Sequence, residues 1–306
     1  MSGATGATRS RWRHLIWIVP SAIAVVVVVI LVARWLRELE PVQEFLLAYP
    51  GETHLPENTV VGTPGWVGWQ HFFNAFFMVL IVKSGLAIRR TKRPVGYWTP
   101  KWSHPRGGKQ PTRITLDTWF HLSLDILWLL NGVIFVTLLI GSGRWVRIVP
   151  TSWEVIPNAL SALLQYASMN WPVENGWVNY NSLQVLTYFV TVFIAAPLAF
   201  ASGVRMSPLW PTDAPRLNRL YPIEWARALH FPVMLYFVGF TIVHVTLVLA
   251  TGALRNLNHI FAARDEVSWI GAGLFTASLV GMATAWLALG PTVLRPIAAL
   301  TGKISR

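Results

Sequence analysis

The sequence contains no cysteine in its 306 residues, and this absence excludes several kinds of chemistry. Disulfide bonds, iron–sulfur clusters, thiolate zinc sites and the covalent attachment of c-type haem all need cysteine. A metal held by this chain must therefore rely on its eight histidines, its carboxylates or its six methionines.

Charged residues are scarce as well. They make up 12% of the chain, against about 25% in an average soluble domain. Hydrophobic residues make up 54%, and there are 17 tryptophans. This composition argues against a soluble enzyme and against a disordered chain, and it predicts a polytopic membrane protein. The formal net charge of +12 does not favour nucleic-acid binding, because the Lys and Arg excess of membrane proteins gathers in cytoplasmic loops.

Long apolar runs are what the sequence has in abundance. A hydrocarbon core about 30 Å thick needs roughly 20 apolar helical residues. Six stretches meet this length, at 14–36, 66–88, 116–141, 183–203, 226–252 and 267–290. The first is too long for the apolar part of a signal peptide, so we expect it to be a retained helix. The predicted fold is an all-α membrane helical bundle with six transmembrane helices.

The distribution of Lys and Arg predicts the orientation in the membrane. Eighteen of the 25 fall in the N-terminal tail, the 89–115 loop, the 205–227 segment and the C-terminal tail, and five fall in the three alternate loops. Both termini are therefore expected in the cytoplasm, in a multi-pass protein of the cell membrane.

The longest segment predicted outside, 142–182, contains a pattern typical of an amphipathic helix from Asn158 to Ser168. Trp153, Trp171 and Trp177 flank it, and such residues favour the membrane–water boundary. The segment is either an interfacial lid that only packs or a docking surface or cover over a cofactor.

Histidines fall into two groups. His14, His54, His104 and His259 lie in loops or at the edges of spans, and we expect solvated or interfacial side chains there. The remaining four, His71, His121, His230 and His244, lie inside predicted spans. Ionisable groups within a membrane are costly and are functional candidates by default.

The depths of these four histidines match in pairs. His230 and His244 are fourteen residues apart, which is about 21 Å along a helix, and they share one helix face. His121 and His71 each lie about five residues into their own spans, which run in opposite directions. The topology therefore places His121 at the depth of His230, near the cytoplasm, and His71 at the depth of His244, near the outside.

Two imidazoles at one depth on different helices suit the two axial positions of a haem iron. A zinc site would need three or four ligands, and neither depth offers a third. Because cysteine is absent, we expect two non-covalent b-type haems, one near each membrane surface. The alternative is four unrelated structural histidines.

Other polar residues in the spans have two interpretations. Arg227, Arg113 and Lys83 lie at the cytoplasmic level of the bundle and either contact haem propionates or extend to the membrane surface as ordinary flanking cations. Asp125 lies one turn beyond His121 and either pairs with Lys83 or relays protons. Gly85 and Gly239 either admit a porphyrin or serve helix packing.

The histidine layout resembles the four-helix di-haem cytochrome b family, which includes the gamma subunit of formate dehydrogenase and the cytochrome b subunit of nickel–iron hydrogenase. The stretches that carry the resemblance are GWQHFFNAFFMVLIVKSG, TWFHLSLD, YNSLQVLTYF and RALHFPVMLYFVGFTIVH. The resemblance implies that His71 with His244, and His121 with His230, each bind one haem b. It also implies electron transfer between a partner redox protein and the quinone pool. The stretch SGRWVRIVP is similar to cytochromes b that serve exported molybdopterin oxidoreductases.

Under this resemblance, 66–252 is the di-haem core and includes the outer segment 142–182. Residues 1–65 add a tail, a first helix and an outer loop, and 253–306 add a last helix and a cytoplasmic tail. Membrane lipid, quinone and a partner oxidoreductase are the expected contacts. No Gly-rich dinucleotide fingerprint follows a strand, so chemistry on a final substrate is expected to belong to the partner.

Two other functions remain open from the residues alone. One is a proton-coupled transporter that uses the intramembrane histidines and Asp125 as proton carriers. The other is a haem-free membrane anchor for another subunit, which explains the hydrophobicity but not the matched depths.

Overall fold

The computed structural model describes residues 6–101, 112–171, 175–211 and 213–306, with side chains from Ile16 onward. His104, a candidate surface histidine, lies outside the described residues. The chain divides into two compact units. Unit 1 comprises residues 1–57, 146–175 and 179–188, and unit 2 comprises residues 58–145, 176–178 and 189–306.

Six helices in the described part of the chain are long and apolar enough to cross a membrane. They are Ile16–Glu38, Gly65–Arg90, Leu116–Gly141, Ser182–Met206, Ile223–Ala250 and Ile270–Ala288. The all-α fold and the multi-pass membrane character predicted from the sequence are confirmed. Apolar side chains such as Ile134 and Ile242 remain exposed along these helices, as expected of surfaces that contact lipid.

In unit 1, α1 (Gly6–Glu38) packs against α5 (Val155–Ala167). The Arg34 guanidinium donates to the Ser168 carbonyl over 3.1 Å, which satisfies an oxygen just beyond the end of α5. The short helix α2 (Glu40–Ala48) begins with proline in its first turn, where no amide partner is lost. The helix predicted for 158–168 is thus confirmed, and it begins three residues earlier.

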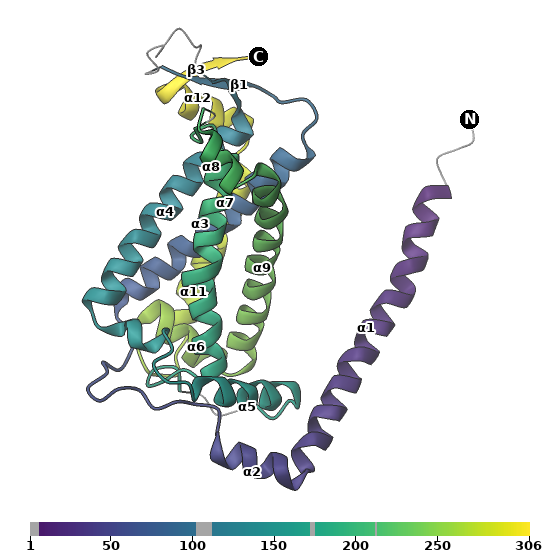
Figure 1. The fold of residues 1–306 in the computed structure, drawn as a ribbon, viewed down its shortest axis with the longest axis vertical. Helices are drawn as coiled ribbons and strands as arrows, with labels where there is room; N and C mark the ends of the chain where they lie inside the picture. The colour runs from purple at the N-terminus through teal and green to yellow at the C-terminus, as the bar shows by residue number, and fades with distance from the viewer. Residues whose placement is uncertain (1–5, 102–111, 172–174, 212) are drawn as a thin grey trace. The chain divides into compact units, whose positions relative to one another are not determined.

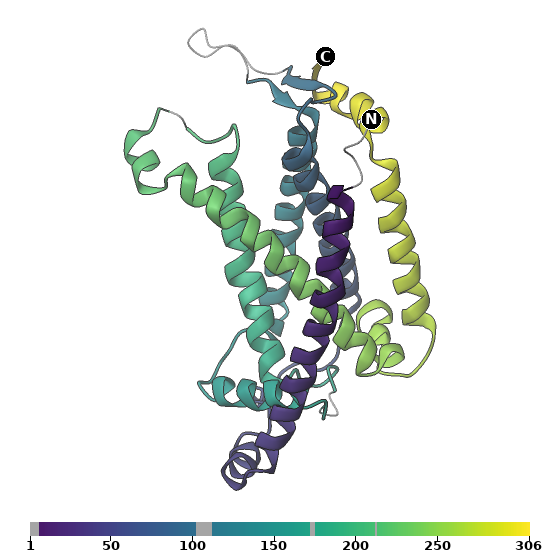
Figure 2. The same cartoon turned by 90° about the vertical axis from the view of Figure 1, so that its right-hand side faces the viewer.

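Unit 2 contains the helices that carry the four intramembrane histidines, which are α3 (Gly65–Arg90), α4 (Leu116–Gly141) and α9 (Ile223–Ala250). It also contains α7 (Ala196–Met206) and α11 (Ile270–Ala288). α3 packs along α4, and α7 packs along α9 (Figure 1). α9 crosses α7 obliquely (Figure 2).

The fourth span is not a uniform α-helix. It runs from α6 (Ser182–Phe189) through a π-helical turn, η3 (Val190–Ala195), into α7. Pro197 lies in the first turn of α7 and has no amide to donate, and the Ala196 amide donates to the Thr191 carbonyl five residues back. The wide turn therefore accommodates a proline that an unbroken α-helix would not.

One end of unit 2 is closed by a small sheet, which we call the sheet end. Its strands β1 (Tyr97–Pro100), β2 (Ile114–Thr115) and β3 (Gly302–Ser305) pair antiparallel in the order β2-β1-β3, with Trp98 opposite Ile304. α12 (Pro291–Thr301) leads into β3, and α8 (Pro215–Leu220) precedes α9. Buried apolar residues beneath the sheet join α3, α4 and α12, namely Leu80, Leu116, Phe120, Leu124, Leu294 and Ala298.

The opposite end of unit 2 has a compact turn after α9. It consists of α10 (Ala253–Leu257) and a π-helical turn, η4 (Asn258–Ala262), which ends at Ala263 in the left-handed conformation. η4 packs on both α3 and α11. We call this the η4 end.

Candidate functional site

The structure brings His121 of α4 and His230 of α9 together near the sheet end. Their ring centres are 6.3 Å apart and their planes differ by 73°. His121 lies five residues after Leu116, where α4 begins, and His230 lies seven residues after Ile223, where α9 begins, so each is within about two turns of its helix start. Two chain segments that start at the same end thus present their imidazoles at one level.

His71 of α3 and His244 of α9 meet near the η4 end. Their ring centres are 6.0 Å apart and their planes differ by 56°. α9 therefore contributes one imidazole to each pair, and its partners come from two different helices. These are the two pairs that the matched depths predict.

An aromatic layer occupies the level between the two pairs. Phe237 lies seven residues from both His230 and His244, on the same face of α9. It contacts Trp128 of α4 edge-to-face, with ring centres 6.1 Å apart. Val233, Ala195 and Met78 pack with them, so the space between the histidine pairs at this level is apolar.

The His121–His230 pair is held by serines on the neighbouring helices. Ser84 Oγ on α3 lies 2.8 Å from His121 Nδ1, and Ser202 Oγ on α7 lies 2.9 Å from His230 Nδ1. Each serine precedes a glycine that faces the same ring. A Cβ at Gly85 would lie 3.4 Å from His121 Cε1, and one at Gly203 would lie 3.6 Å from His230 Cε1.

Aromatic rings pack on the His71–His244 pair. His244 stacks on Phe240 with ring centres 5.4 Å apart and planes differing by 10°. Phe261 of η4 contacts His71 edge-to-face at 5.9 Å. Gly68 allows η4 to approach α3, because a side chain there would overlap the Ile260 carbonyl oxygen.

Asp125 lies beside the first pair. Its Oδ2 is 3.8 Å from His121 Nε2, and its side chain is 32% exposed. A carboxylate at this position places negative charge next to the ring nitrogen that Ser84 leaves free.

Lys83 has a different set of contacts from those expected for it. Its ammonium donates to the Trp286 carbonyl and, over 2.9 Å, to the Leu289 carbonyl. These are carbonyls at the C-terminal end of α11, where a cation is favoured by the helix dipole. Among the described residues Lys83 makes no ion pair with Asp125, so it acts as a C-terminal cap of α11.

The two arginines proposed for propionates lie in distinct places. Arg113 donates to the Arg306 carbonyl over 2.8 Å and stacks on Tyr97 at the sheet. Arg227 is exposed on the first turns of α9. A third cation, Arg89, lies 4.0 Å over the ring of Phe231, which is next to His230. The sequence singled out Arg89 only as a loop charge.

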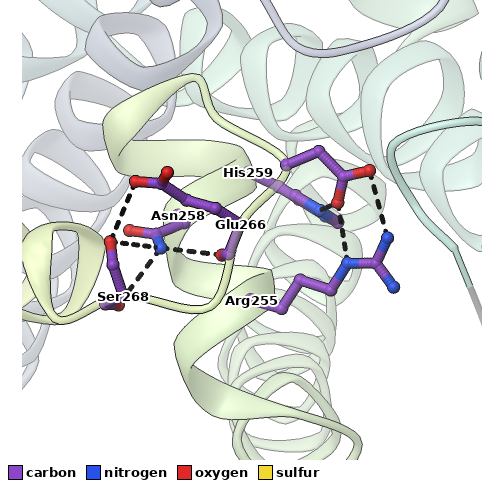
Figure 3. A network of polar contacts seen from close by, with 6 residues as sticks. Arg255, Asn258, His259, Glu266 and Ser268 are labelled. Atoms are coloured by element: carbon purple, nitrogen blue, oxygen red, sulfur yellow. Dashed lines mark hydrogen bonds and ion pairs between the residues drawn. The ribbon is translucent and has the colours of Figure 1, made fainter.

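His259 corrects one expectation from the sequence. We expected a solvated or interfacial side chain, but His259 is 5% exposed and its Nε2 lies 2.8 Å from Asp265 Oδ1 (Figure 3). Arg255 binds the same carboxylate through two hydrogen bonds of 2.7 and 3.0 Å. Burial of His259 is possible because this carboxylate and Trp177, 5.3 Å away, replace water around the ring.

The network around η4 also joins the turn to α11. Asn258 is fully buried, and its side chain donates to the Glu266 and Ser268 carbonyls (Figure 3). It also accepts from the Gly271 amide at the start of α11. Hydrogen bonds from Arg255 and then from His259 lower the pKa of Asp265 to about 2. The hydrogen bond to Asp265 raises the pKa of Arg255.

The residues present fit two haem irons better than a zinc ion. Within the described ranges no three His, Cys, Asp or Glu side chains gather as a metal-ion site would require. Ring centres 6.0 and 6.3 Å apart would leave room for one metal ion between the two imidazoles of each pair, so His71 with His244, and His121 with His230, could each hold one haem iron through nitrogen.

Sequence reasoning found the four histidines but not the serines beside two of them. The available signal was a Ser-Gly pair that occurs twice, at Ser84–Gly85 on α3 and at Ser202–Gly203 on α7. These two helices pack against α4 and α9. Serine and glycine are common in membrane helices, so the pair gains meaning only from the contacts with the rings.

Comparisons with known proteins add no identification. No family model matches the chain, and neither the curated proteins nor the solved structures give a match.

Proposed function

We propose that this chain is a membrane cytochrome with two b-type haems, which transfers electrons between a partner oxidoreductase and the quinone pool. The observation that carries the proposal is the pairing of His71 with His244 and of His121 with His230 at the separation that two axial ligands need. Four unrelated structural histidines have no reason to adopt this spacing twice.

Each residue has a defined part in this proposal. His71 and His244 would hold one haem, and His121 and His230 the other, as neutral imidazoles bound through nitrogen. Haem iron supplies one-electron chemistry when bound. Phe237 and Trp128 would form an apolar layer between the two sites.

The partners belong to the proposal as well. Exposed apolar helices indicate contact with membrane lipid. The resemblance to di-haem cytochromes b supports a quinone and a redox partner, and the SGRWVRIVP stretch supports an exported molybdopterin oxidoreductase. The Lys and Arg distribution supports cytoplasmic termini.

A test follows from the pairing. The full chain is purified from membranes, and each histidine is replaced by alanine in turn. His121→Ala and His230→Ala should remove the same b haem, while His71→Ala and His244→Ala should remove the other. His54→Ala, at an exposed histidine in unit 1, is the matched control and should keep both haems.

The result also separates the competing functions. Substitutions within one pair that affect different haems would overturn the pairing. Protein that never carries a chromophore, yet loses proton-coupled uptake when Asp125 or His121 is changed, would favour the transporter, for which the 3.8 Å approach of these two side chains is the supporting contact.

A further inference from the structure

We propose that Ser84 and Ser202 are positioning residues that fix the proton of His121 and His230 on Nδ1 and so leave each Nε2 free to bind iron. This inference rests on the proposed function and extends it to two residues that do not touch the haem iron themselves.

A serine hydroxyl has a single proton to donate. Ser84 Oγ lies 3.0 Å from the Ile81 carbonyl, so its proton is donated to the backbone one turn earlier. Ser202 Oγ likewise lies 2.7 Å from the Leu198 carbonyl and 3.1 Å from the Ala199 carbonyl.

With its proton committed, each serine oxygen is left as an acceptor. The only group within reach on the imidazole is Nδ1, at 2.8 Å for His121 and 2.9 Å for His230. Nδ1 must therefore carry the proton and donate it. A neutral imidazole has one N–H, so Nε2, on the far side of the ring, keeps its lone pair.

Burial of the two serines favours the same protonation of Nδ1 at all times. Ser84 is 2% exposed and Ser202 is fully buried, so water cannot take over the hydroxyl's role at either position. The adjacent Gly85 and Gly203 leave room for the two rings at their Cε1 edges. Two helix pairs, α3 with α4 and α7 with α9, thus build the same support for one histidine each.

The two serines lie against His121 and His230, so their effect belongs to that site. His71 and His244 pack against Phe261 and Phe240. A hydrogen bond from Nδ1–H makes the imidazole a stronger electron donor and orients its ring. The serines should therefore stabilise the ferric form of the haem at His121 and His230, and their loss should raise its midpoint potential.

The test uses Ser84→Ala and Ser202→Ala in the full chain, with Ser123→Ala as the matched control. Ser123 donates to the Trp119 carbonyl over 2.9 Å on α4, as Ser84 does to Ile81, and no hydrogen bond to a histidine ring is found for it among the described residues. We expect each test variant to lower haem affinity at this site about 10–100-fold. We also expect a higher midpoint potential and an altered low-spin ferric EPR signal from that haem, with the other haem unchanged.

A second measurement needs no haem. Nitrogen-15 NMR of histidine-labelled apoprotein should show His121 and His230 protonated on Nδ1 in the wild type, and mixed or reversed tautomers in the variant of the adjacent serine. Ser84→Thr, which keeps a hydroxyl, should retain the wild-type signal.

The outcomes separate this inference from the proposed function. Wild-type protein that binds no haem overturns the proposed function whatever the serine variants do. Two haems in the wild type, with test variants that match Ser123→Ala in affinity, potential, EPR signal and tautomer, overturn the role of the serines alone.

Discussion

Single side chains give the site its asymmetry. The His121–His230 pair has two serine oxygens and the Asp125 carboxylate around it, and phenylalanine rings pack on the His71–His244 pair. Acceptors and negative charge stabilise a ferric haem. The serines and Asp125 should therefore lower the midpoint potential of a haem held by His121 and His230.

Substitution of Asp125 tests directly whether a negative charge beside His121 lowers the midpoint potential. Asp125→Asn keeps the shape of the side chain and removes a charge 3.8 Å from His121 Nε2. Redox titration of the variant should show a higher midpoint potential for that haem only, because the oxidised form loses a nearby anion. Glu224→Gln, at an exposed carboxylate in the first turn of α9, is the control. A lowered or unchanged potential in Asp125→Asn would contradict the assignment.

The sequence predicts the four intramembrane histidines well because depth follows from the position of a residue within its span. It does not predict the burial of His259, which depends on a turn that places the Asp265 carboxylate 2.8 Å from the His259 ring. That turn needs Ala263 in the left-handed conformation, which no sequence pattern here signals. It also missed the cap formed by Lys83, because the end of α11 is brought to α3 only by tertiary packing.

At the level of helices and turns, Lys83 of α3 contacts the end of α11, although the two helices are far apart in the sequence. Lys83→Met removes the donor to the Trp286 and Leu289 carbonyls while keeping the length of the side chain. We expect a loss of about 1–2 kcal/mol in the free energy of unfolding, because the last carbonyls of α11 lose their cation. Thermal unfolding in detergent measures the loss, and Lys83→Arg should restore most of it.

The same variant separates the cap from a role at the haem. The haem content and spectrum of Lys83→Met should match the wild type. A variant that unfolds normally but lacks a haem would show that Lys83 serves the cofactor rather than α11.

The η4 turn should respond to acid. Because the pKa of Asp265 is lowered to about 2 in the folded protein from its ordinary 3.8, its ionised form stabilises the fold. This contribution is fully present above about pH 4 and is lost as the pH falls through about 2. The thermal midpoint of the wild type should therefore drop over this range.

Asp265→Asn tests which residue is responsible. The variant should be less stable than the wild type at neutral pH, and the difference should shrink as the pH approaches 2. Glu44→Gln, at an exposed residue of α2, should follow the wild-type profile. An equal acid response in Asp265→Asn and the wild type would assign the effect to other carboxylates.

Elements differ in how far the sequence predicts them. The six spans follow from apolar length alone, and the structure places each within several residues of its expected ends. The sheet of β1, β2 and β3 was not predicted, because its strands are two to four residues long and because β1 pairs with β3, which lies far from it in the sequence. The π-helical turn before Pro197 was not predicted either. Proline in a span predicts that the helix is interrupted, but not which irregular turn replaces it.

For the molecule as a whole, the absence of cysteine makes topology easy to measure. Single cysteines at Glu57 and Arg216, both exposed, introduce the only thiols in the chain. If both termini are cytoplasmic, a membrane-impermeant maleimide added to intact cells should label Glu57→Cys and spare Arg216→Cys until the membrane is opened. The reverse labelling would show that the charge distribution does not set the orientation.

Two bound haems are the central claim about the whole molecule. The measurement that tests it most directly is the pyridine haemochrome of the purified full chain, quantified against protein and compared with its dithionite-reduced spectrum. We predict two b-type haems per chain and a reduced alpha band that titrates in two steps. Colourless protein, or a chain that takes up no haem when supplied with it, would contradict the account.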